Sequence, residues 1–147
     1  MTHAGIVCAI VASMHYQVPA DGLLAVYQAE NGSNGQWVRN INGTYDVGPM
    51  QFNTTYLAQL QRQYGIRPED VESTGKCYPF ELAAWRIETH IRKGRGDLWE
   101  RIAHFHSSSP AEVAKYRARL ILYAGRWRKW LEENFQVAVV REKKTTN

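Results

Sequence analysis

The sequence predicts a single, mainly α-helical domain in which one small irregular hairpin interrupts the helices. The 147 residues fit one ordinary domain, and a hydrophobic content of 44% is enough to bury a core. Apolar residues recur with the period of an amphipathic helix along most of the chain. This period breaks between 31 and 49, where three Asn-Gly pairs signal turns. We therefore expect about six or seven helices and a loop with a hairpin.

The first part of the chain predicts two helices followed by the hairpin. The first helix covers about 4–16, and the second begins at Pro19 and ends at Asn31-Gly32. Short aromatic and β-branched pieces at 37–38 and 44–45 predict the hairpin. The second helix therefore ends directly before the irregular loop.

Helical periodicity returns in the second part of the chain. Gly65 and Gly94 supply stop signals, and Asp97 with Glu100 forms a capping box. The last helix is long and is expected to fray after Phe135. The expected spans, in order, are 53–65, 79–94, 98–106 and 110–135.

No linker in the chain is long enough to separate two domains. We expect one domain over 1–147, in which 136–147 forms a flexible C-terminal tail. The sequence contains no run of eighteen apolar residues, so it predicts no membrane-spanning helix. The apolar run over 5–14 is short and lacks a basic leader, so we expect no intact signal peptide in this chain.

The charge balance favours an anionic partner. Lys and Arg outnumber Asp and Glu by 18 to 14, and the pI is about 9.2. Nucleic acid, an acidic polysaccharide or a membrane surface would fit this charge. Binding to nucleic acid would require the basic residues of the last helix to form a stripe with Trp127 and Trp130. A basic run of this kind is more often a solvated helix face, and we expect no nucleic-acid partner.

Glu30 is the first candidate functional residue, because it shares a helical stripe with apolar residues. Leu23, Val26 and Tyr27 precede it on that stripe. Partial burial and the negative end of the helix dipole both favour the protonated form of this carboxyl. A protonated acid in a cleft can act as a general acid. Alternatively, Glu30 turns outward or pairs with an arginine such as Arg39.

The segment from Asp46 to Asn53 is suited to a loop that contacts carbohydrate. Gly48 permits a close approach of the backbone, and Gln51 and Asn53 offer donors and acceptors for hydroxyl or acetamido groups. An aromatic ring, Tyr45 or Phe52, could stack on a sugar. Asn53 could instead serve only as the N-cap of the next helix.

Motifs in three parts of the chain, between about 8 and 123, resemble the soluble-type (SLT) lytic transglycosylases. The match is closest to the small members that accompany conjugation, type IV secretion and type III secretion machines. A helix ending in glutamate is matched by Glu30 and Asn31, and a Gly-Leu-Met-Gln-Ile-Asn motif is matched at 48–53. A Tyr-His-Ser type motif is matched at 105–107, and the tyrosine that follows it in the family is matched by Tyr116.

The resemblance implies a lysozyme-like fold and cleavage of peptidoglycan between N-acetylmuramic acid and N-acetylglucosamine. Glu30 would protonate the glycosidic oxygen and then accept a proton from the muramic 6-hydroxyl, which closes a 1,6-anhydro ring. Asp46 is a second candidate, either as a stabiliser of positive charge or as a turn residue. With Asp46 taking part, lysozyme-like hydrolysis is the alternative. The implied substrate-binding residues are Asn31, Gly48, Met50, Gln51, Asn53, Phe105, His106 and Tyr116.

The sequence departs from the family pattern at three positions. Asn31 replaces the common serine, Pro49 replaces leucine, and Phe105 replaces a tyrosine whose hydroxyl would contact substrate. These departures leave open a catalytically weak scaffold that binds the cell wall. Tyr116 lies on an apolar stripe, so a plain core role is its alternative.

Cys8 and Cys77 are the two cysteines of the chain, and taken alone they could be buried thiols. The resemblance implies that they form a disulfide and that the protein works in the oxidising periplasm. It also implies peptidoglycan strands as substrate, components of a secretion or conjugation machine as partners, and a monomer. No metal-binding spacing or nucleotide-binding motif occurs, so we expect neither a metal nor a cofactor.

Overall fold

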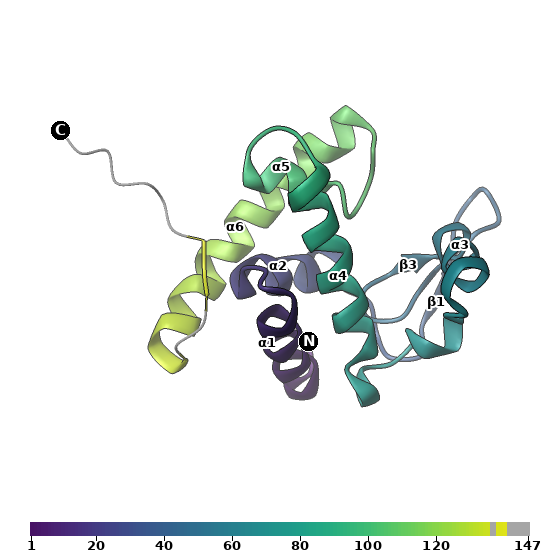
Figure 1. The fold of residues 1–147 in the computed structure, drawn as a ribbon, viewed down its shortest axis with the longest axis horizontal. Coiled ribbons are helices and arrows are strands. Elements are labelled where there is room, and N and C mark those ends of the chain that lie inside the picture. Colours follow the sequence, from purple (N-terminus) through teal and green to yellow (C-terminus); the bar gives the residue numbers. More distant parts are fainter. Residues whose placement is uncertain (136–137, 141–147) are drawn as a thin grey trace.

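The computed structural model describes residues 1–135 and 138–140 of the chain (Figure 1). This part is mainly helical and contains a small sheet, as the sequence predicts. Its α-helices are α1 (His3–Tyr16), α2 (Ala20–Glu30), α3 (Thr54–Tyr64), α4 (Tyr78–Lys93), α5 (Leu98–Ala103) and α6 (Pro110–Asn134), and its 3-10 helices are Pro68–Asp70 and Thr74–Lys76. None of these helices is long and apolar enough to cross a membrane.

Three short strands form an antiparallel sheet in the order β1 (Trp37–Arg39), β2 (Tyr45–Val47) and β3 (Phe52–Asn53). The first two are the predicted hairpin. The third was not predicted, because two residues are too few to show strand periodicity. Its pairing places Asp46 directly opposite Asn53, so two candidate residues become cross-strand neighbours.

Helix α2 is the centre of the helical part. It contacts α1, α4 and α6, and every residue from Ala20 to Tyr27 is buried. The sequence predicts one apolar stripe on this helix, whereas the packing covers it on all sides. The sheet and α3 lie on one side of α4, and α1 and α6 lie on the other (Figure 1).

The first turn of α2 is joined to the chain after α6. Asp21 is 0% exposed, and its carboxylate accepts hydrogen bonds from the Val140 N–H at 3.0 and 3.1 Å and from Arg128 Nε at 3.4 Å. The Ala20 N–H donates to the Ala138 carbonyl at 2.9 Å. Burial raises the pKa of Asp21, although these donors lower it. The rest of the expected flexible tail, 136–137 and 141–147, lies outside the described residues.

A disulfide joins Cys8 of α1 to Cys77, the residue before α4. This confirms the expected pairing and is typical of proteins from oxidising compartments. The bond connects positions 69 apart in sequence, so it restricts a large part of the unfolded chain.

Replacing both Cys8 and Cys77 by alanine should lower the free energy of unfolding. The chain-entropy model for a loop of this length gives about 4 kcal/mol. Denaturation by guanidinium, with and without reductant, measures the change. Reductant should destabilise the wild type and leave the double variant unchanged. Equal stability of the oxidised wild type and the variant would contradict this role.

Candidate functional site

A polar hollow of about 380 Å³ opens at the C-terminal end of α2. We call it the Glu30 hollow. Its lining comes from α2, the sheet and its loops, α3, α4 and the chain after α5. The lining residues are Glu30, Asn40, Asn42, Thr44, Asp46, Gln51, Asn53, Tyr56, Arg86, Phe105 and His106.

Glu30 is the last residue of α2, and its side chain is 10% exposed. Asn31 follows it in the left-handed conformation, and its N–H donates to the Tyr27 carbonyl at 3.1 Å, which ends the helix. The Tyr116 hydroxyl donates to Glu30 Oε1 at 2.9 Å, and His106 Nδ1 lies 3.4 Å from the same oxygen. Glu30 therefore faces inward, and the alternative of an outward-turned side chain does not hold.

Tyr116 serves both the core and the carboxyl group. It is fully buried in α6, and its hydroxyl reaches Glu30. Burial raises the pKa of Tyr116 well above its usual value, and the nearby Glu30 raises it further. The phenol therefore keeps its proton and remains a hydrogen-bond donor. The core role of this tyrosine therefore holds, and its hydroxyl also contacts the Glu30 carboxyl, although Tyr116 itself does not line the hollow.

His106 stacks on Tyr116 with parallel rings, whose centroids are 4.5 Å apart. Its side chain is 34% exposed, so one face is open to the hollow. The hydrogen bond with Glu30 raises the pKa of His106 above its ordinary value of 6.5, and partial burial opposes the shift. The site thus presents a carboxyl with one oxygen, Oε1, facing both a phenol and an imidazole.

Asp46 and Asn53 lie side by side across the sheet. Asn53 Nδ2 donates to Asp46 Oδ1 at 3.1 Å and to Thr44 Oγ1 at 3.0 Å. Asn53 Oδ1 accepts from the Thr55 N–H at 2.9 Å, as an N-cap does. Asn53 is therefore the N-cap of α3, and its amide also orients the second carboxyl of the hollow.

Four of the candidate substrate-binding residues, the buried Tyr116 among them, do not line the hollow. Asn31 is exposed beside it, and Met50 is fully buried in the core. Gly48, with φ of 71°, packs so closely on Val71 that a Cβ would overlap the Val71 carbonyl oxygen. Gln51 does line the hollow, although its amide donates to the Gly48 carbonyl at 2.8 Å.

Gly32 is a site-shaping residue that the sequence reading treated only as a helix stop. A Cβ at this position would overlap the Gly48 carbonyl oxygen and lie 2.8 Å from Gln51 Nε2. The turn over 48–51 can therefore rest against the chain just after Glu30 only because position 32 has no side chain. The signal that sequence reasoning missed is that the glycine of an Asn-Gly pair can end a helix and also allow another backbone segment to pack closely against it.

Arg86 is a second residue that sequence reasoning missed. Its guanidinium lies 4.1 Å from the Tyr56 ring centroid and 4.8 Å from that of Phe105. Phe105 is buried, and its ring supports Arg86. Phe52 is buried as well and offers no face for a sugar. Arg86 falls three residues after Ala83, so it lies at the edge of the apolar stripe of its helix. That position is the sequence signal that could have identified it.

Comparison with known proteins adds no relative to this picture. No protein-family model matches the chain, and no curated protein matches it. Among the described residues, no group of three His, Cys, Asp or Glu side chains could hold a metal ion. The function therefore has to be argued from the chemistry of Glu30, Asp46, His106 and Tyr116.

The substitution Gly32→Ala should destabilise the protein by about 1–3 kcal/mol, because the new methyl group overlaps a backbone oxygen. Chemical denaturation measures the change. Gly125→Ala is the matched control, since a Cβ there meets nothing within 4 Å and helix propensity favours alanine. If Gly32→Ala is as stable as the wild type, the contact between these two loops is not as tight as described.

The pKa of His106, followed by NMR titration, should fall when Glu30 is replaced by glutamine, because the hydrogen bond to the carboxylate is its largest raising cause. A raised pKa in the fold means that the pair stabilises the protein fully below pH 6.5 and loses this effect as pH rises through the raised value. His90, whose pKa burial lowers to about 4, is the internal control. An unchanged His106 titration would show that the two groups are not coupled.

Proposed function

We propose that this chain is a peptidoglycan lytic transglycosylase with a lysozyme-like fold and that Glu30 is its catalytic acid and base. One observation supports this most strongly. Glu30, the segment around Asp46, His106 and Tyr116 come from separate parts of the sequence and gather around one carboxyl group. They are the parts that resemble the family, and nothing in their sequence order alone requires them to meet.

The proposed reaction needs one carboxyl for two proton transfers. Glu30 gives its proton to the glycosidic oxygen as the bond from that oxygen to C1 of N-acetylmuramic acid breaks. The 6-hydroxyl oxygen then bonds to C1 and passes its proton back to Glu30. The products are a free 4-hydroxyl on N-acetylglucosamine and a 1,6-anhydro end, and no water is consumed.

Contacts of Glu30 suit both protonation states. Tyr116 and His106 approach Oε1, which leaves Oε2 as the oxygen that carries the exchanged proton. After Glu30 has donated, the same two groups stabilise the carboxylate through charge-assisted hydrogen bonds. The low exposure of Glu30 restricts water near it and favours attack by the 6-hydroxyl.

Several polar groups are available to position the sugar rings. Asn40, Asn42 and Thr44 from the hairpin also line the hollow, and their amides and hydroxyl suit hydroxyl and acetamido groups. Arg86 brings a guanidinium to the same hollow, where it can bind a carbonyl or carboxylate of the strand. The net charge of +4 favours the anionic glycan.

The setting of the enzyme follows from the disulfide and from the resemblance together. A disulfide suits the periplasm, where peptidoglycan is accessible. A small enzyme there would open the wall locally so that a secretion or conjugation apparatus can pass. Components of that apparatus are its proposed partners, and the chain would act as a monomer.

A lysozyme-like hydrolase is the second candidate, and the position of Asp46 favours it. Asp46 lines the same hollow as Glu30, and Asn53 holds its carboxyl in place. In a transglycosylase this carboxylate stabilises the positive charge that develops at C1. In a hydrolase it would serve as the nucleophile or activate water, and the product would carry a reducing end.

Mass spectrometry of fragments released from purified peptidoglycan tests the proposal. The wild type should release anhydro ends, and Glu30→Gln should lower the rate by at least about a hundredfold, because the exchanged proton is lost. Glu133→Gln, on the exposed end of α6, is the matched control and should be fully active.

The other outcomes assign the alternatives. Reducing ends that disappear in Asp46→Asn would identify a hydrolase. Release of no fragments by a folded wild type would identify a scaffold that binds the wall without cleaving it. An active Glu30→Gln variant would remove Glu30 from the mechanism.

A further inference from the structure

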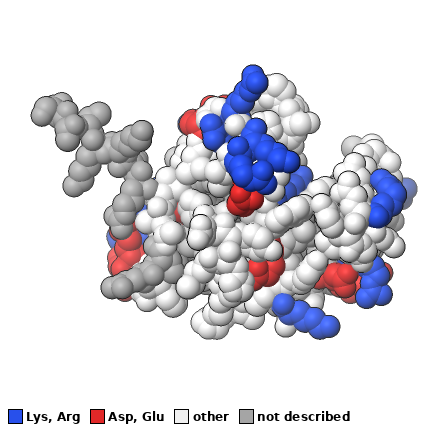
Figure 2. Space-filling view, viewed as in Figure 1, with Lys and Arg blue, Asp and Glu red and all other residues white. Residues whose placement is uncertain are grey.

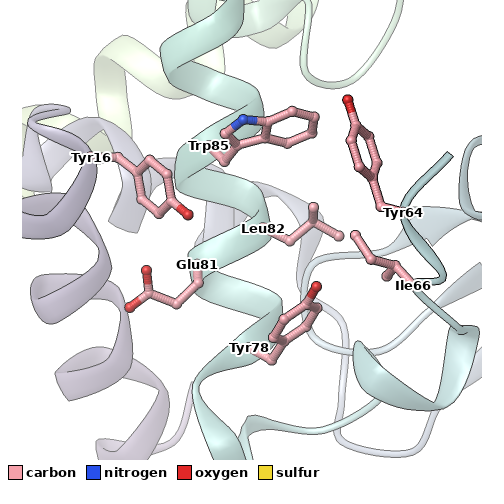
Figure 3. A pocket seen from close by; sticks show the side chains of 7 residues that line it. All are labelled: Tyr16, Tyr64, Ile66, Tyr78, Glu81, Leu82 and Trp85. Carbon is pink, nitrogen blue, oxygen red and sulfur yellow. The ribbon is translucent and has the colours of Figure 1, made fainter. Parts of the chain in front are cut away.

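A second hollow of about 380 Å³ shares no lining residue with the Glu30 hollow. We call it the aromatic groove. Tyrosine or tryptophan rings, two aliphatic side chains and one carboxylate line it, as Figure 3 shows. These residues are Tyr16, Tyr64, Ile66, Tyr78, Glu81, Leu82 and Trp85.

The groove follows one face of α4. Tyr78, Glu81, Leu82 and Trp85 are spaced for a single helical face. In Figure 3, Tyr64 and Ile66 face this stretch from one side, and Tyr16 lies near Glu81 on the other. Tyr64 meets the edge of Trp85, with ring centroids 6.0 Å apart. Because the disulfide joins α1 to the residue before Tyr78, it fixes the α1 and α4 walls of the groove relative to each other without a ligand.

The groove continues into a neighbouring hollow of about 590 Å³ that shares Tyr64, Ile66 and Tyr78. This extension adds the carboxylates of Glu69 and Asp70. The combined lining contains three carboxylates and a single lysine, whereas the whole chain has a net charge of +4. Asp70 already pairs with Arg67 at 3.6 Å. Within the described part of the chain, Glu69 and Glu81 are therefore the groove carboxylates with no arginine or lysine partner. Figure 2 shows a cluster of Lys and Arg side chains near the C-terminal end of α4 and a mixture of acidic and basic side chains lower down.

The negative charge reaches the aromatic rings. Burial raises the pKa of Tyr78, and the Asp70 carboxylate raises it further. Glu81 accepts a hydrogen bond from His15 at 2.7 Å through Oε1, and this contact orients its carboxylate beside Tyr16. A cation in the groove would therefore lie beside both aromatic rings and carboxylates.

This combination favours one class of ligand. Three carboxylates repel an anionic glycan strand and give a neutral sugar no charge to pair with. A Lys or Arg side chain gains a cation–π contact and a carboxylate partner, and its methylene stem can pack on Leu82 and Ile66. In an extended peptide every second side chain points to the same side, so two such side chains could enter the two connected hollows.

We propose that the aromatic groove and its extension bind a basic peptide segment of a partner protein. This inference does not rest on the proposed enzymatic function, because the two sites share no lining residue. The whole protein could lose its wall-cleaving activity in Glu30→Gln and still bind the peptide.

The probe is the peptide acetyl-Gly-Arg-Gly-Arg-Gly-amide, titrated into the full chain and followed by calorimetry and by the indole N–H signal of Trp85. The matched control peptide carries citrulline in place of arginine, which keeps the shape and removes the charge. The arginine peptide should bind at least about tenfold more tightly, and its advantage should shrink as salt is added. Equal binding of both peptides, or of neither, would overturn the proposal.

Two protein variants test the residues themselves. Glu81→Gln removes the carboxylate without changing its shape, and Tyr64→Ala removes a ring that is 61% exposed, so neither should disturb the fold. Each should weaken the arginine peptide by about fivefold or more. Glu133→Gln and Tyr45→Ala, both exposed and outside the groove, should bind as the wild type does. If the groove variants also bind normally, or if chitotetraose displaces the peptide from Trp85, the proposal is wrong.

Discussion

The burial of α2 from Ala20 to Tyr27 is the constraint on which the rest of the structure depends. A helix covered by α1, α4 and α6 cannot shift or rotate without opening the core, so its last residue is held in one place. That residue is Glu30, and α6 brings Tyr116 to it from the far side of the sequence. Asp21 at the opposite end of α2 draws in the backbone of Val140 and the side chain of Arg128. Packing thus places a carboxyl at each end of one buried helix.

Around Glu30, the protein uses the same residues for structure and for chemistry. Tyr116 fills the core and donates a hydrogen bond, while Asn53 caps α3 and orients Asp46. Because each group has a structural partner, its side chain is held before any ligand arrives. The backbone also serves both purposes at Gly32, since the turn that carries Gln51 packs directly against the chain after Glu30.

Helix α4 contributes side chains to two separate sites. One side contributes Arg86 to the hollow that contains Glu30 and Asp46, and another face contributes Glu81 and Trp85 to the aromatic groove. Arg86 is thus a cation in the hollow where the anionic glycan strand is proposed to bind, and Glu81 is a carboxylate in the groove where the basic peptide is proposed to bind. The disulfide at the start of α4 anchors this helix to α1, so it supports both sites.

Local patterns in the sequence determined the helices, the hairpin and the candidate acid, because helix periodicity, caps and Asn-Gly turns act over a few residues. Only the tertiary structure decided which candidates meet. Met50 and Gly48 belong to the same segment as Gln51, yet packing sends the first two into the core and against Val71. Arg86 and the third strand were missed, since a guanidinium between two rings and a two-residue pairing depend on partners distant in sequence.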